Sequence, residues 1–224
     1  MKIDSRHHDA VTTHAGWVEA SLGMLDEHHL VAWSRSMASR ERFGIDLAMR
    51  LRAYPETETW SLAGAVIRDL ETFCQQFERE MEESAAERGA PAAPLARSIE
   101  GPGGIVERMR ELPDDPGVHV KRRYYLWRDA DVLLRHDTKL FSELVDAMAG
   151  VAAESEYASE DLLLIHRAAF IGSPALNTYA ADPSGQFRAW LPATGQTRGR
   201  PAHSLLWRRI TGLESPPFAG LELI

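Results

Sequence analysis

The sequence predicts a fold of the α/β class, with α+β as the alternative: helix-rich layers around a small mixed sheet, an N-terminal helical hairpin and an irregular C-terminal arm. Three observations predict it. Apolar residues recur at helical spacing over 70–81, residues 118–127 alternate between two faces, and residues 162–171 form an apolar run typical of a buried strand. Strands separated by helices favour layers joined by right-handed crossovers.

Composition narrows the class of protein. The chain has 224 residues, 44% of them hydrophobic and 26% charged, which is the balance of a globular protein with a core. A formal charge of -8 repels phosphate backbones and acidic lipids, so any nucleic-acid contact is expected to be local. The single cysteine, the lack of a long apolar run and an N-terminus unlike a signal peptide predict a cytoplasmic protein without membrane contact.

Residues 1–56 are predicted to form the helical hairpin. Two sets of apolar residues recur at helical spacing and end before Pro55: Val18, Leu22 and Leu25, then Phe43, Leu47, Leu51 and Tyr54.

Residues 57–171 are predicted to form the central α/β core. A strand within 59–67 is followed by Asp69 as the N-cap of the helix over 70–81, whose apolar stripe holds Cys74 as a core residue. A Pro/Gly linker over 89–104, a short helix over 105–112, the strand over 118–127, a helix from Asp131 or Asp137 to about 154 and the strand over 162–171 complete it. Residues 172–224, which hold many of the prolines, are predicted to be a loop-rich arm packed on this core.

One face of the strand over 118–127 is the predicted binding site. It carries cations interleaved with aromatic rings, which can hold phosphates, carboxylates or stacked bases: His119, Lys121, Arg123, Tyr125 and Trp127. The alternative is structural, because long basic side chains also cover sheet faces and pair with acids of neighbouring helices. A second basic run, Arg198, Arg200, Arg208 and Arg209 with Trp207, would form a positive cleft if it met this face.

Histidines beside acids suggest a second function, a metal-dependent hydrolase. The groups are His7-His8-Asp9, Glu27-His28-His29 and His136-Asp137. Adjacent residues of a helix point about 100° apart, and no HExxH pair is present, so solvated side chains near helix ends are the alternative interpretation.

His136-Asp137, preceded by Leu133 and Leu134 and followed by Lys139, resembles the His-Asp doublet of HD-domain phosphohydrolases. The resemblance covers about seven residues and implies an all-helical metal site completed by an earlier histidine and a later aspartate. The nearest earlier histidine, His119, lies on a predicted strand, so we interpret Asp137 as the N-cap of the helix that begins at Thr138. The order of elements over 59–171 also loosely resembles barstar, in topology alone.

No complete catalytic motif is present. The glycines over 101–104 form neither a P-loop nor a dinucleotide fingerprint, and no serine is flanked as in a nucleophile elbow. We therefore expect a non-enzymatic binding or regulatory protein without a cofactor, whose partner is a protein or, as the alternative, a local nucleic-acid segment. A third hypothesis is an oligomeric scaffold subunit with exposed apolar patches on the helical hairpin or the C-terminal arm.

Overall fold

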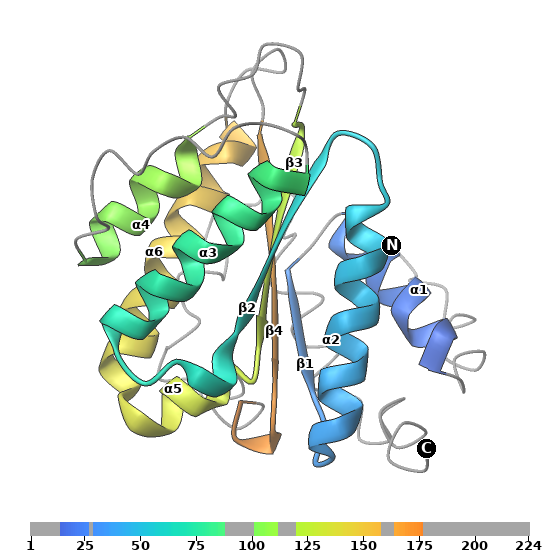
Figure 1. The fold of residues 1–224 in the computed structure, drawn as a ribbon, viewed down its shortest axis with the longest axis horizontal. Helices are drawn as coiled ribbons and strands as arrows, with labels where there is room; N and C mark the ends of the chain where they lie inside the picture. Colours follow the sequence, from blue (N-terminus) through green and yellow to red (C-terminus); the bar gives the residue numbers. More distant parts are fainter. Residues whose placement is uncertain (1–13, 27–28, 88–100, 112–119, 158–163, 177–224) are drawn as a thin grey trace, which may run out of the picture.

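A computed structural model describes residues 14–26, 29–87, 101–111, 120–157 and 164–176 of the chain (Figure 1). The elements follow in this order: α1 (His14–Leu25), β1 (Leu30–Trp33), α2 (Met37–Arg52), β2 (Thr57–Ala63), the short 3-10 helix η2 (Gly64–Val66), α3 (Leu70–Glu87), α4 (Gly101–Arg110), β3 (Arg122–Arg128), α5 (Asp131–His136), α6 (Thr138–Tyr157) and β4 (Ile165–Gly172).

The strands form one four-stranded sheet in the order β1-β4-β3-β2. Every pairing in it is parallel, so the sheet is not mixed as expected from the sequence, while the predicted α/β class is confirmed. Parallel neighbours require crossovers, and the helices between the strands supply them. The carboxyl ends of all four strands therefore lie at one edge of the sheet.

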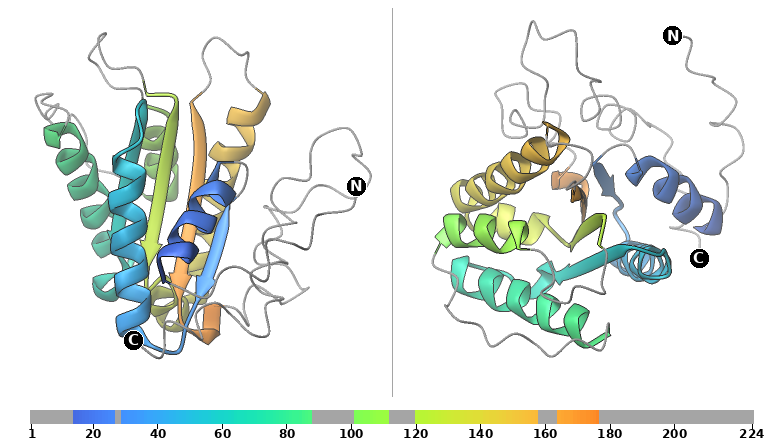
Figure 2. Two further views of the ribbon diagram at one scale, coloured as in Figure 1. Left: turned by 90° about the vertical axis from the view of Figure 1, so that its right-hand side faces the viewer. Right: turned by 90° about the horizontal axis from the view of Figure 1, so that it is seen from above.

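Helices cover both faces of the sheet, as Figure 2 shows. One hydrophobic core lies between the sheet and α3, α4, α5 and α6, and contains Trp60, Phe77 and Trp127. The second core lies between the opposite face and α1 and α2, and contains Phe43 and Leu126. Strand β3 contributes alternate residues to the two cores, which is the period of two predicted from the sequence.

A strand separates the two N-terminal helices, where the sequence predicted a hairpin of consecutive helices. Strand β1 is four residues long, and its first three residues are buried. It pairs with β4 at one end of the sheet order. A run of four residues contains only two repeats of the strand period, so periodicity alone could not reveal it.

The ends of three helices depend on particular residues. Helix α4 begins at Gly101, so residues 101–104 do not belong to the predicted linker; Pro102 suits a first turn because its missing N–H would have no partner there. Asp69 accepts a hydrogen bond from the amide of Thr72 at 2.8 Å, as predicted for a cap. Asp137 accepts one from Leu140 at 2.9 Å, which confirms it as the N-cap of α6 and divides the predicted long helix in two.

The outer edge of β2 is covered by a carboxylate. Glu80 of α3 is buried, and its Oε2 accepts a hydrogen bond of 2.8 Å from the amide of Ser61. Arg52 of α2 lies 3.5 Å from the same oxygen, so helices from opposite faces of the sheet meet around this strand. Burial raises the pKa of Glu80, against the influence of these partners.

The predicted C-terminal arm lies outside the described residues, apart from 172–176. In the part of the chain that is described, no helix has the length and apolarity needed to cross a bilayer.

Candidate functional site

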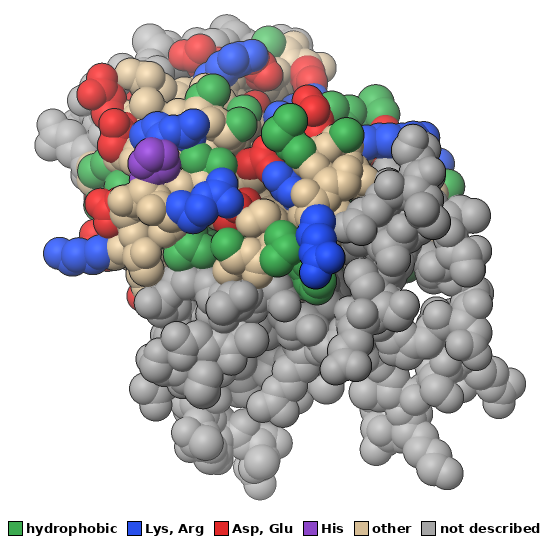
Figure 3. Space-filling model, turned by 90° about the horizontal axis from the view of Figure 1, so that it is seen from below, with side chains coloured by type: hydrophobic (Ala, Val, Ile, Leu, Met, Phe, Trp, Pro, Cys, Tyr) green, Lys and Arg blue, Asp and Glu red, His purple; other side chains and the backbone are tan. Residues whose placement is uncertain are grey.

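The connections leave the sheet on opposite faces near β4. Strand β1 leads into α2 on one face, whereas β3 leads into α5 and α6 on the other, and β4 lies between these two strands. In parallel sheets, diverging connections open a crevice at the carboxyl ends of the strands, where ligands commonly bind. Figure 3 views this edge, where basic and acidic side chains lie close together.

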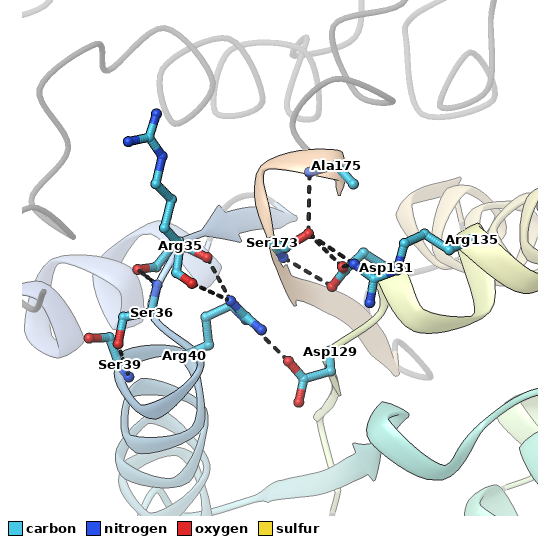
Figure 4. Close-up of polar contacts among 10 residues, drawn as sticks. Arg35, Ser36, Ser39, Arg40, Asp129, Asp131, Arg135, Ser173 and Ala175 are labelled. Atoms are coloured by element: carbon cyan, nitrogen blue, oxygen red, sulfur yellow. Dashed lines mark hydrogen bonds and ion pairs between the residues drawn. The ribbon is translucent and has the colours of Figure 1, made fainter.

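Arg40 joins the two diverging loops. It lies in the first turn of α2, and its Nε donates to Asp129 Oδ1, 3.1 Å away, in the loop after β3. Its Nη1 donates to the carbonyls of Ser34 at 2.7 Å and Arg35 at 3.3 Å (Figure 4). The Arg40 side chain is 11% exposed, so the contact is largely desolvated and fixes the loops relative to each other.

Asp131 joins the ends of β3 and β4. Its carboxylate is buried and accepts hydrogen bonds from the Ser173 amide at 3.0 Å and the Ser173 hydroxyl at 2.5 Å. Arg135 lies 2.7 Å from the same carboxylate. A Cβ at Gly172 would lie 2.7 Å from Asp131 Oδ1, so the close approach of strand and carboxylate requires glycine at this position.

Two serines shape the start of α2. Ser34 Oγ accepts from the amide of Ser36, and Ser36 Oγ accepts from the amide of Ser39, both at 3.1 Å. The second bond is an N-cap, which satisfies a donor of the first helical turn. Arg35, between the two serines, is exposed, and its side chain extends away from Arg40 (Figure 4).

Another arginine lies at the end of β3. Arg128 is the last residue of β3, and its aliphatic stem passes beneath α2 at Gly44. A Cβ at Gly44 would lie 2.6 Å from the Cδ of Arg128, so glycine provides the space for this stem. Around the loops after β1 and β3, the aspartates Asp129 and Asp131 therefore lie with the arginines Arg35, Arg40 and Arg135.

The predicted strand face lies mostly in the interior. Arg123, Tyr125 and Trp127 do share one side of β3, but each is at most 2% exposed because α3, α4, α5 and α6 cover that side. The expectation that they form an open docking surface is therefore wrong. Lys121 is exposed and pairs with Glu56 at 2.8 Å, and His119 lies outside the described residues.

Arg123 has structural partners on every side. Glu58 lies 2.6 Å from the guanidinium, and Nη1 and Nη2 donate to the carbonyls of Met109 at 2.6 Å and Glu111 at 2.9 Å. The guanidinium also lies 4.4 Å from the ring centre of Trp60. A cation at the last carbonyls of α4 is favourable, so this arginine holds the helix on the sheet.

Tyr125 and His166 form a buried pair beside this arginine. The Tyr125 hydroxyl lies 2.7 Å from His166 Nδ1. Burial, with Arg123 and Arg167 nearby, lowers the pKa of His166 to about 3, so the imidazole is neutral at ordinary pH. Burial raises the pKa of Tyr125.

The predicted metal groups do not converge in the part of the structure that is described. His29 is buried at the start of β1, where its Nδ1 accepts from the amide of Ala168 at 3.0 Å. His136 is exposed on α5, at the other end of the sheet. Residues 7–9, 27 and 28 are not described, and the described residues contain no group of three or more metal-ligating side chains.

Cys74 is buried in the larger core, as the sequence predicted. Burial raises the pKa of its thiol to about 11, which keeps it protonated and unreactive at neutral pH.

Sequence reasoning missed the residues of the carboxyl edge. The signal that could have identified them is a polar group directly after three of the four strands: Ser34-Arg35-Ser36 after β1, Asp129-Ala130-Asp131 after β3 and Ser173 after β4. Without β1 and the strand order, nothing indicated that these groups meet. Comparison with protein-family models, curated proteins and solved structures found no match.

Proposed function

We propose that the chain is a non-enzymatic binding or regulatory protein whose binding site is the carboxyl edge of the sheet. The proposed ligand is a small molecule with a phosphate or carboxylate group. The observation that carries the proposal is the divergence of the connections after β1 and β3, together with the Arg40–Asp129 contact that joins the diverging loops.

The charge at this edge favours an anion. The loops after β1 and β3, with the helix turns that follow them, hold the arginines Arg35, Arg40 and Arg135 and the aspartates Asp129 and Asp131, although the whole chain has a formal charge of -8. Arg40 and Arg135 pair with Asp129 and Asp131, and Arg35 is exposed and extends outward from the start of α2. Guanidinium groups suit phosphate and carboxylate because their N–H groups match two oxygens at once.

The edge is also held in place before a ligand arrives. Arg40 fixes the loops after β1 and β3, and Asp131 fixes the end of β4 through Ser173. A site whose loops are already ordered loses little conformational entropy on binding, which supports recognition of small ligands.

The experiment is a titration with inorganic phosphate, AMP and citrate, followed by thermal unfolding at constant ionic strength. A ligand at about ten times its Kd stabilises the fold by about 1.4 kcal/mol. We expect at least one of the three to raise the Tm, and we expect Arg35→Ala to lower the affinity for that ligand about fivefold or more.

Arg79→Ala is the matched control, because Arg79 is an exposed arginine on α3 that pairs with Glu83. This variant should bind like the wild-type chain. If none of the three probes raised the Tm at about 10 mM, which is ten times a weak Kd of about 1 mM, or if both variants lost binding equally, the proposal would be wrong.

A further inference from the structure

The contact between Arg40 and Asp129 uses one of the two parallel hydrogen bonds that a guanidinium and a carboxylate can form. Arg40 Nε donates to Asp129 Oδ1, while Arg40 Nη1 donates to the carbonyls of Ser34 and Arg35 (Figure 4). Within the described part of the chain, neither Arg40 Nη2 nor Asp129 Oδ2 forms a hydrogen bond. Arginine–carboxylate pairs are frequently bidentate, so this single bond leaves one donor and one acceptor for another molecule.

The two remaining atoms are accessible beside the existing bond. Arg40 Nη2 is attached to the same carbon as Nε, and Asp129 Oδ2 to the same carbon as Oδ1. Both side chains are largely but not fully buried, and neither atom is among the buried polar atoms of the described residues that lack a partner. Solvent therefore reaches both atoms, in a setting where hydrogen bonds are stronger than in bulk water.

We infer that the ligand of the carboxyl edge is a phosphorylated sugar, whose hydroxyl groups contact Arg40 Nη2 and Asp129 Oδ2 and whose phosphate contacts Arg35. The inference rests on the proposed function and names the class of its ligand. A hydroxyl group both donates and accepts hydrogen bonds. Two neighbouring hydroxyls of a sugar therefore supply an acceptor for the arginine and a donor for the aspartate.

The unbonded carboxylate oxygen also disfavours a ligand with anionic groups at both ends. An ionised carboxylate only accepts hydrogen bonds. A second anion next to Asp129 would be repelled, and repulsion between like charges is strong where little water is present. The part of the ligand at Asp129 is therefore neutral and donates a hydrogen bond, whereas its anionic part lies towards Arg35.

Arg35 is placed to hold the phosphate. Its carbonyl lies 3.3 Å from Arg40 Nη1, so its backbone is next to the guanidinium of Arg40. The exposed side chain of Arg35 extends away from Arg40 in Figure 4, and it must change rotamer to meet a ligand at Asp129. Arg40 and Asp129 need no such change, because the contact between them is already formed.

Isothermal titration calorimetry on the full chain at constant ionic strength tests the inference. Ribose 5-phosphate and ethyl phosphate are both phosphate monoesters, but ribose 5-phosphate alone carries sugar hydroxyls. We expect it to bind about fivefold or more tightly than ethyl phosphate, as hydrogen bonds to charged groups allow. AMP distinguishes two sources of the same chemistry: tighter binding than ribose 5-phosphate indicates a nucleotide, and equal or weaker binding indicates a free sugar phosphate.

Asp129→Asn tests the role of the carboxylate. Asp129 has a φ of 48°, a conformation that asparagine adopts as well, and the amide oxygen still accepts from Arg40. Binding of ribose 5-phosphate should weaken about fivefold, because a charged acceptor is replaced by a neutral one. Binding of ethyl phosphate should stay equal or become tighter, since a nearby negative charge is lost.

Asp46→Asn is the matched control, because it removes the same charge from α2 at a residue that pairs with Arg42. This variant should bind both probes like the wild-type chain, and circular dichroism verifies that both variants fold. Equal affinity of the wild-type chain for the two probes would overturn the inference and leave the proposed anion site standing. So would an equal loss of both probes in Asp129→Asn. If neither probe bound, the proposed function and the inference would fail together.

Discussion

The two ends of the sheet contain similar chemical groups in different settings. At the amino end, Glu58 and Arg123 are buried beneath α3 and α4, beside His166. At the carboxyl end, Arg40 in the first turn of α2 and Asp129 in the loop after β3 form a similar pair beside the exposed Arg35. The comparison teaches that cover, and not residue type, sets how far such a pair is removed from water: the side chains of Arg123 and Glu58 are at most 3% exposed, against 11% and 18% for Arg40 and Asp129.

The largest effect is expected at the covered end. Glu58→Gln removes the charge that neutralises Arg123 in a nearly waterless setting, while the arginine keeps its charge. Breaking a buried pair from one side costs about 3–5 kcal/mol. Urea unfolding should show this loss in the free energy of unfolding.

Lys121→Met provides the control, since Lys121 pairs with Glu56 at the surface of the same strand end. The free energy of unfolding of this variant should fall by no more than about 1 kcal/mol. Equal effects of the two variants would contradict the view that cover decides what such a pair contributes.

We also expect acid to destabilise the fold first at the covered amino end of the sheet. His166 has a pKa of about 3 in the fold, against an ordinary value of 6.5, because burial and the nearby cations disfavour its charged form. The groups that influence or contact it are Arg110, Arg123, Arg167, Glu58 and Tyr125. Below pH 6.5 the unfolded chain takes up a proton at His166 that the folded chain does not. The contribution of the neutral histidine to the free energy of unfolding is therefore complete above pH 6.5 and is lost as the pH falls towards 3.

The measurement is the free energy of unfolding at several pH values between 7 and 4. One such histidine contributes a slope of about 1.4 kcal/mol per pH unit. His166→Gln keeps a polar group beside Tyr125 but cannot titrate, so the difference between the two curves isolates the histidine. Parallel curves would show that His166 does not titrate differently in the fold.

A smaller effect is expected at the carboxyl end, where Asp131 is buried but its partner Arg135 is more than half exposed. Asp131→Asn keeps the shape of the side chain but loses the charge that holds Arg135 and Ser173. Replacing a charged acceptor costs about 1–3 kcal/mol, and here Arg135 is free to turn to solvent. Thermal unfolding should show a loss below that of Glu58→Gln; a larger loss would reverse the ranking of the two ends.

Much of the fold follows from local patterns in the sequence. Helix α3 and strand β3 were predicted because their apolar residues repeat over enough residues to define a period, and strand β4 was predicted from a continuous apolar run. The caps at Asp69 and Asp137 were predicted from residue type and position. Local patterns could not supply the strand order, which depends on how distant segments pair.

The candidate site was not predictable in the same way. Alternation correctly placed Arg123, Tyr125 and Trp127 on one side of β3, but it does not tell whether helices cover that side. Basic residues among rings suggested an open surface, whereas Glu58 and the carbonyls of Met109 and Glu111 neutralise Arg123 within the fold. These partners are far from Arg123 or on other elements, so the sequence did not reveal them.

The carboxylate of Glu80 has a consequence for how the molecule can associate. Its contact with the Ser61 amide, flanked by Arg52, occupies a backbone donor that an incoming strand would otherwise use. Open sheet edges are the usual starting points for strand exchange and amyloid-like growth. At Ser61 the fold therefore opposes the addition of another strand beside β2.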